Sequence, residues 1–186
     1  MKNTLSLISL IFCFQGLAQG KSQATEIWSP TPVEVKTNKN ISLPPDDAII
    51  LFDGKDFSNW EQQYSNQPPK WIINDDESMM VVNGTGGIKT KDSYGSVQLH
   101  IEWKTSTEIG DNNGQKRSNS GVFLQGRYEI QILDSYSNPT YVNGQAGSVY
   151  KQYIPLVNAS KPPGDWQTYD IIFNAPVFKN NNLVEP

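Results

Sequence analysis

The alternation of apolar and polar residues along the chain predicts a protein built from short β-strands. Residues 166–174 alternate in this way, and residues 121–125 and 128–133 are expected to pair as a hairpin around a tight turn at 126–127. The clearest segment is 95–104, where neighbouring side chains point to opposite faces of a strand. In order, its alternating residues are Val97, Gln98, Leu99, His100, Ile101, Glu102, Trp103 and Lys104.

Shorter apolar runs at 48–52, 71–73, 79–82 and 148–153 are expected to add further strands between turn-forming residues. No segment after residue 20 shows a helical period. The pattern therefore predicts an all-β sandwich or barrel. Residues 19–46 are rich in proline and polar residues and are expected to form a linker, followed by a single domain over residues 47–186.

Residues 1–18 have the pattern of a secretory signal peptide. Lys2 precedes an apolar run over residues 5–14, and the small residues Gly16 and Ala18 stand where a signal peptidase would cut. The run is shorter than the roughly 20 residues that span a bilayer. The mature chain is therefore expected to lack a transmembrane segment and to lie in the periplasm or outside a bacterial cell. Cys13 would be removed with the signal peptide.

Composition narrows the chemistry that the chain can perform. The 186 residues include 15 Lys and Arg, 19 Asp and Glu, and one each of His and Cys, with a net charge of −4. This charge gives no basic footprint for a nucleic-acid partner. One histidine and one cysteine cannot form a Cys/His zinc site, and a histidine-dependent triad would have to use His100. The chemistry therefore falls to carboxylates, amides and hydroxyl groups.

The segment 128–134 contains the most informative polar residues. On a strand, Glu129 and Gln131 share one face and Ile130 points to the other, while a bulge could return Asp134 to the polar face. Carboxylates, amides and flat aromatic rings on a sheet are typical of a carbohydrate site. The further candidates to line it are Glu102, His100, Asn119, Ser120, Tyr150 and Trp166.

The order Glu129-x-Gln131-x-x-Asp134 partly matches a pattern of retaining glucanases with a β-jelly-roll fold, Glu-x-Asp-x-x-Glu. In those enzymes two carboxylates about 5 Å apart act as nucleophile and acid/base. The central acid is an amide here, and an amide cannot share a proton as an acid does. A retaining glucanase therefore stays an alternative interpretation.

Five segments in order resemble the 3-keto-disaccharide hydrolase family. They are residues 52–60 (FDGKDFSNW), 99–103 (LHIEW), 119–124 (NSGVFL), 128–135 (YEIQILDS) and 161–169 (KPPGDWQTY). The resemblance implies a concanavalin A-like jelly-roll β-sandwich with a concave cleft. It implies a hydrolase or lyase that cleaves glycosides oxidised at C3 of the sugar. It also implies later strands that this sequence lacks, so the domain is expected to be incomplete at its C-terminal end.

Cleavage of a 3-keto glycoside needs a base for the C2 proton and a group that stabilises the enolate oxygen. For the reaction that the resemblance implies, the catalytic candidates are Glu129, Glu102 and Asp134. Gln131, Asn119, Ser120, His100, Tyr150 and Trp166 are expected to bind the carbohydrate. No metal ligand is assigned, although a hard cation such as Ca²⁺ would suit these oxygens. A lectin-like module that binds sugar without catalysis is the other alternative.

Overall fold

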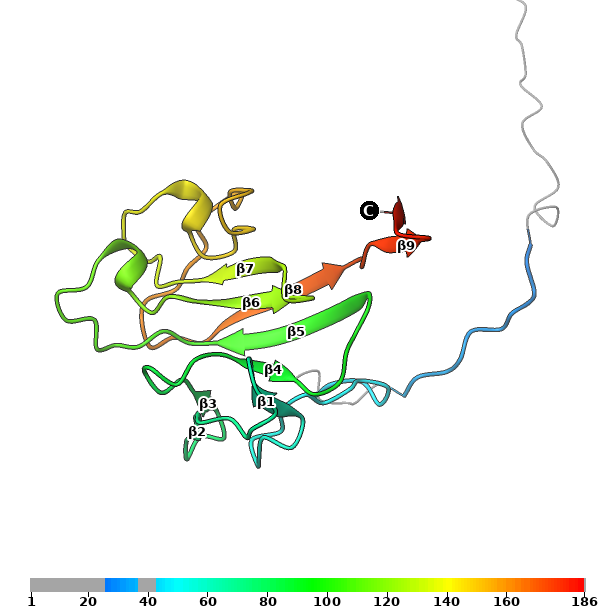
Figure 1. Ribbon diagram of the computed structural model, residues 1–186, viewed down its shortest axis with the longest axis horizontal. Helices are drawn as coiled ribbons and strands as arrows, with labels where there is room; N and C mark the ends of the chain where they lie inside the picture. Colours follow the sequence, from blue (N-terminus) through cyan, green and yellow to red (C-terminus); the bar gives the residue numbers. More distant parts are fainter. Residues whose placement is uncertain (1–25, 37–42, 186) are drawn as a thin grey trace, which may run out of the picture. The chain divides into compact units, whose positions relative to one another are not determined.

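The computed structural model describes residues 26–36 and 43–185 (Figure 1). The predicted signal peptide lies outside the described residues. The contacts divide the chain into one unit up to Ile50 and a second from Leu51 onward. The described part of the first unit contains no helix or strand. This includes residues 48–50, so the expected strand at 48–52 does not form.

The second unit is almost entirely β-structure, which confirms the all-β prediction. Within the described residues its strands form five antiparallel pairs. These pairs are β1 (Trp60–Gln62) with β4 (Ile88–Thr90), β2 (Ile72–Ile73) with β3 (Met79–Met80), β5 (Val97–Trp103) with β8 (Gln167–Phe173), β6 (Ser120–Leu124) with β7 (Tyr128–Ile132), and β9 (Val177–Lys179) with β10 (Asn182–Glu185). The short 3₁₀ helices η2 (Gly114–Lys116) and η3 (Val142–Gly144) lie in the long loops.

The core forms where the β6–β7 hairpin packs against the β5–β8 pair. Figure 1 shows β8 passing across β6 and β7. The Tyr128 ring lies 5.8 Å from that of Phe173, and the Tyr169 hydroxyl donates a 2.7 Å hydrogen bond to the backbone oxygen of Gln131. Tyr169 also packs against Trp103, with 5.1 Å between the ring centroids. The odd-numbered residues of β8 therefore face β7, as the alternation predicts.

A tight turn of three residues, 125–127, closes the β6–β7 hairpin. Gln125 and Gly126 have φ values of +53° and +63°, and the Arg127 amide donates a hydrogen bond to the Leu124 carbonyl at 3.1 Å. This turn has one residue more than the two-residue turns that are commonest in hairpins. It sets the register in which Phe123 lies opposite Glu129.

The buried interior contains many polar side chains. Trp103, Leu124 and Leu133 are the buried apolar residues among those described, whereas seven polar residues are buried. One of them, Asp134, accepts hydrogen bonds at Oδ2 from both Nε and Nη2 of Arg117, the first at 2.8 Å. The Asp134 amide donates to the Arg117 carbonyl, and Asn138 Nδ2 donates to the Asp134 carbonyl at 2.6 Å. The ion pair thus holds the long loops against the end of β7.

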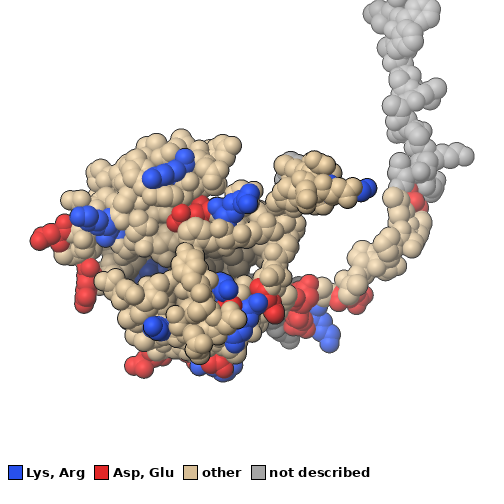
Figure 2. Space-filling view, in the orientation of Figure 1, with Lys and Arg blue, Asp and Glu red and all other residues tan. Residues whose placement is uncertain are grey.

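Charged side chains of both signs mix on the surface. Figure 2 shows Lys and Arg interspersed with Asp and Glu over the visible face of the strand-rich unit, with no basic cluster there. Within the described ranges, no helix has the length and apolar character needed to cross a bilayer.

Replacing Asp134 should destabilise the fold strongly. Asp134→Asn leaves the largely buried Arg117 charge unpaired, and losing one partner of a buried ion pair typically costs about 3 kcal/mol or more. Urea unfolding would measure this loss. Lys55→Met, which breaks the exposed Lys55–Asp53 pair, is the control and should change stability little. Similar midpoints for both variants would contradict the structural role of Asp134.

Candidate active site

The outer side of the β6–β7 hairpin brings several predicted site residues together. Residues 147–150 extend this hairpin by running along the free edge of β7, where Val149 bridges Ile130 and the Tyr150 amide donates to the Glu129 carbonyl at 2.9 Å. Opposed residues on neighbouring strands share a face. Two rows result, which together we name the Glu129 face. They are Phe123, Glu129 and Tyr150, and then Gly121, Gln131 and Ser148.

Glu129 occupies space that Gly121 leaves open. A Cβ atom on Gly121 would lie 2.7 Å from Glu129 Cγ and closer still to its carboxylate. Partial burial raises the pKa of the Glu129 carboxyl above its usual range. Among the described residues, no hydrogen-bond donor or cation contacts this carboxylate. A carboxylate that is partly desolvated and unpaired is suited to accept a proton.

A pair of tyrosines stands beside Glu129. The hydroxyl groups of Tyr150 and Tyr141 lie 2.6 Å apart, and Lys151 Nζ lies 5.4 Å and 6.0 Å from their ring centroids. The hydrogen bond with Tyr150, burial and the charges of Tyr150 and Glu129 raise the pKa of Tyr141 to about 12. Tyr141 therefore stays protonated at neutral pH. Its ring lies against Gly144, where a Cβ atom would meet Tyr141 Cδ2 at 2.6 Å.

Buried amides line the next row. Gln131 is fully buried, and its Nε2 donates to Asn119 Oδ1 at 3.1 Å and to Gln115 Oε1 at 3.4 Å. Gln115 in turn donates to the Gly144 carbonyl at 2.9 Å. Gln131 Oε1 and Ser148 Oγ are buried and have no hydrogen-bond partner within the part of the chain that the structure describes. Both oxygens keep a free lone pair that a buried water molecule could fill.

Other predicted site residues point elsewhere. Asp134 is engaged by Arg117, as described above. Ser120 lies opposite Ile132, on the core side of the hairpin and away from Glu129. Its position shows that residues next to each other in a motif need not share a face.

Glu102 and His100 lie on the far side of the β5–β8 pair. They are even-numbered residues of β5, whereas the odd-numbered residues of β8 face β7. His100 Nδ1 contacts Asp170 Oδ1 at 2.7 Å, and both side chains are largely exposed. Trp166 belongs to this side too, because Lys104 Nζ lies 4.6 Å above its ring. The structure therefore does not bring these three residues to Glu129.

Sequence reasoning missed Tyr141, Phe123 and Gln115 as parts of this site. Phe123 was missed because the expected turn at 126–127 would set it opposite Ile130, whereas the turn at 125–127 sets it opposite Glu129. Tyr141 and Gln115 come from long loops, where no periodicity indicates direction. In the described ranges, no cluster of three or more His, Cys, Asp or Glu side chains forms a metal site.

The fold and site define an all-β protein with a single unpaired carboxylate on an aromatic and amide-lined face. A family model described as the 3-keto-alpha-glucoside-1,2-lyase-like domain matches residues 47–182, so the chain belongs to this family, as its motifs predict. A curated 3-keto-disaccharide hydrolase from Bacteroides thetaiotaomicron is 28% identical over 190 aligned positions, which cover 84% of this chain. The chain spans 64% of that relative's length.

Solved structures agree with this membership. The crystal structure of a candidate glycosyl hydrolase from Parabacteroides distasonis matches with a TM-score of 0.82 and 44% identity, over 91% of this chain and 73% of that chain. A second candidate glycosyl hydrolase from the same organism matches with a TM-score of 0.52 and 21% identity, over 68% of this chain and 64% of its own. The second likeness is one of fold alone.

The raised pKa of Glu129 predicts a pH-dependent effect on stability. A carboxyl group with a raised pKa in the folded protein stabilises the folded state below the pKa it has in the unfolded chain, about 4.3. This stabilisation is lost as the pH rises through the pKa of the folded protein. Glu129→Gln removes the charged form. The stability of this variant relative to the unmodified protein should therefore increase between acid and neutral pH, as thermal melts at several pH values would show. Glu102→Gln, on an exposed position, is the control, and an equal pH trend in both variants would contradict the assignment.

Proposed function

We propose that this protein cleaves the glycosidic bond of 3-keto glycosides by elimination and that Glu129 is the general base. The observation that supports this most directly is the partly buried, unpaired carboxylate of Glu129 over Gly121, flanked by aromatic rings. Membership of the 3-keto-alpha-glucoside-1,2-lyase-like family and the name of the Bacteroides relative point to the same substrate class.

The reaction follows from the acidity that a ketone gives to its neighbouring carbon. In a 3-keto glycoside, the Glu129 carboxylate would remove the proton on C2, and the electron pair would first form an enolate with the C3 oxygen. That pair then forms a C1–C2 double bond as the C1–O bond breaks, and the leaving oxygen takes a proton. Addition of water across the double bond would give net hydrolysis, whereas release before this addition would make the enzyme a lyase.

The tyrosine pair is suited to the proton that the leaving oxygen requires. Tyr150 is next to Glu129 in the same row, and its hydroxyl group is held by that of Tyr141. A neutral phenol can donate a hydrogen bond to the enolate oxygen or a proton to the leaving oxygen. Phe123 and Tyr150 offer flat rings on either side of the carboxylate, on which a sugar ring could pack.

Two alternatives make different demands on the same face. A retaining glucanase needs two carboxyl groups about 5 Å apart. In the described residues no second carboxylate is brought beside Glu129, because position 131 is an amide and Asp134 binds Arg117. A lectin-like module is favoured by the exposed aromatic surface of Phe123, which is 51% accessible. Sugar binding without turnover of any 3-keto glycoside would support the module.

Glu129→Gln should abolish most activity toward a 3-keto disaccharide. Loss of a general base typically lowers kcat by about 10²- to 10⁴-fold. Turnover is followed by release of the aglycone or second sugar. Glu102→Gln, which removes a carboxylate from the far side of β5, should retain near-normal kcat/KM. Equal activity of Glu129→Gln and the unmodified protein would refute the proposal.

Tyr150→Phe and Tyr141→Phe separate chemistry from binding. If Tyr150 donates to the developing charge, its loss should lower kcat by about 10²-fold with a smaller change in KM. Tyr141→Phe, which removes only the partner hydroxyl, should have a weaker effect and should shift the alkaline limb of the pH–rate profile. Tyr153→Phe alters an exposed tyrosine of the same loop and is the control. A loss confined to KM would assign Tyr150 to binding alone.

A further inference from the structure

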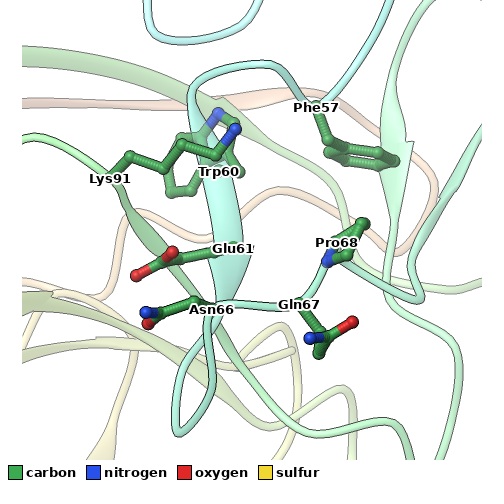
Figure 3. Close-up of a pocket in the computed structure, with 7 residues that line it drawn as sticks. All are labelled: Phe57, Trp60, Glu61, Asn66, Gln67, Pro68 and Lys91. Carbon is green, nitrogen blue, oxygen red and sulfur yellow. The ribbon is translucent and has the colours of Figure 1, made fainter.

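The segment 52–60, the first of the motifs shared with the family, plays no part in the reaction proposed at Glu129. It lines a separate pocket of about 350 Å³ at β1 (Figure 3). In Figure 1, β1 and β4 lie on one side of β5 in the view, whereas β6 and β7 lie on the other. The pocket is thus distinct from the Glu129 face. Its volume lies within the range of small-molecule sites.

The walls of this pocket are held by hydrogen bonds and ring contacts. The Trp60 indole N–H donates to the Leu51 carbonyl at 2.7 Å, and the Phe57 ring stacks on Phe52 with centroids 5.9 Å apart. The loop after β1 is closed by hydrogen bonds from the Gln62 backbone amide to the Gln67 carbonyl and from its side-chain amide to the Pro68 carbonyl, both at 2.9 Å. These contacts hold the pocket walls in place before a ligand binds, which lowers the entropic cost of binding.

The lining combines flat apolar surfaces with polar groups. Figure 3 shows Phe57 and Pro68 on one side of the view and Glu61 and Asn66 on the other. Glu61 is mostly buried, and Lys89 Nζ contacts its Oε1 at 3.0 Å, which leaves Oε2 for a ligand. Lys91 Nζ donates one hydrogen bond to the Ser58 carbonyl at 2.5 Å and has further protons to donate.

These groups match the chemistry of a sugar ring. A pyranose has apolar C–H faces that pack on aromatic rings and a rim of hydroxyl groups that both donate and accept hydrogen bonds. Glu61 Oε2 can accept from such hydroxyl groups, the Asn66 amide can donate and accept, and Lys91 can donate. Glu61 and Lys91 are the charged residues of the lining, and their opposite charges sum to zero. The lining therefore favours a neutral polyhydroxylated ligand over a strongly anionic one.

We propose that this pocket, which we name the Trp60 pocket, is a second saccharide-binding site, separate from the Glu129 face. The proposal does not depend on catalysis at Glu129. A site of this kind would bind unoxidised sugars, because nothing in its lining requires a ketone.

The test is NMR titration of the full chain with cellobiose and with methyl β-glucoside. The Trp60 indole N–H signal, assigned with Trp60→Phe, should move in a saturable way. Glu61→Gln and Asn66→Ala should weaken binding at this signal by about tenfold, as expected for loss of a hydrogen bond that involves a charged or amide group. Glu129→Gln should bind the same sugars at the Trp60 pocket with unchanged affinity.

Two controls lie close to the pocket without lining it. Tyr64→Ala removes a side chain that is 91% exposed in the same loop, and Lys70→Met removes a nearby positive charge. Both should leave the titration unchanged. The proposal is overturned if neither sugar moves the Trp60 signal at millimolar concentration, or if Glu61→Gln and Asn66→Ala bind as tightly as the unmodified protein. The titration of the unmutated chain tests the proposal by itself, so the experiment stays decisive even if one of the variants fails to fold.

Discussion

The ion pair between Arg117 and Asp134 is the interaction on which the surroundings of Glu129 depend. Asp134 follows the end of β7, and Arg117 precedes the start of β6. The ion pair therefore joins the two strands at the open end of the hairpin, opposite its turn. Asn138 extends the connection by hydrogen-bonding both the Asp134 carbonyl and the backbone of Gly114. These contacts hold the two long loops beside β7, and the loops supply the Gln115 and Tyr141 side chains. A buried ion pair often adds little net stability, and here its role is positional.

Alternation along the chain was sufficient to predict β5, β7 and β8, since each is long enough to show a period of two. It also placed Glu129 and Gln131 on one face. It could not tell which polar faces meet, because parity fixes a direction within one strand and not the side of the sandwich on which that direction ends. Glu102 and Glu129 both lie on polar faces, yet the core separates them. β1 and β4 were missed because three residues show no period.

Two glycines shape the proposed site because they have no side chain. Gly121 leaves room for the Glu129 carboxylate and Gly144 for the Tyr141 ring. Glu129 therefore comes from a strand, whose position is fixed by its hydrogen-bonded ladder, and the tyrosine pair is held by a loop contact and by the edge of β7. This arrangement places a single carboxylate among rings and amides. Such a site is better suited to moving one proton than to the two-carboxylate chemistry of ordinary glycosidases.

The turn at Gln125 and Gly126 decides which side chains of the β6–β7 hairpin face outward. Because side chains alternate, a slip of one residue in the β6–β7 register would turn Glu129 inward and Ile130 outward. A misregistered chain would then bury the Glu129 charge and display an apolar strand at the same time. Errors at this turn would therefore produce molecules that lack the Glu129 face and are prone to aggregate through the exposed apolar strand.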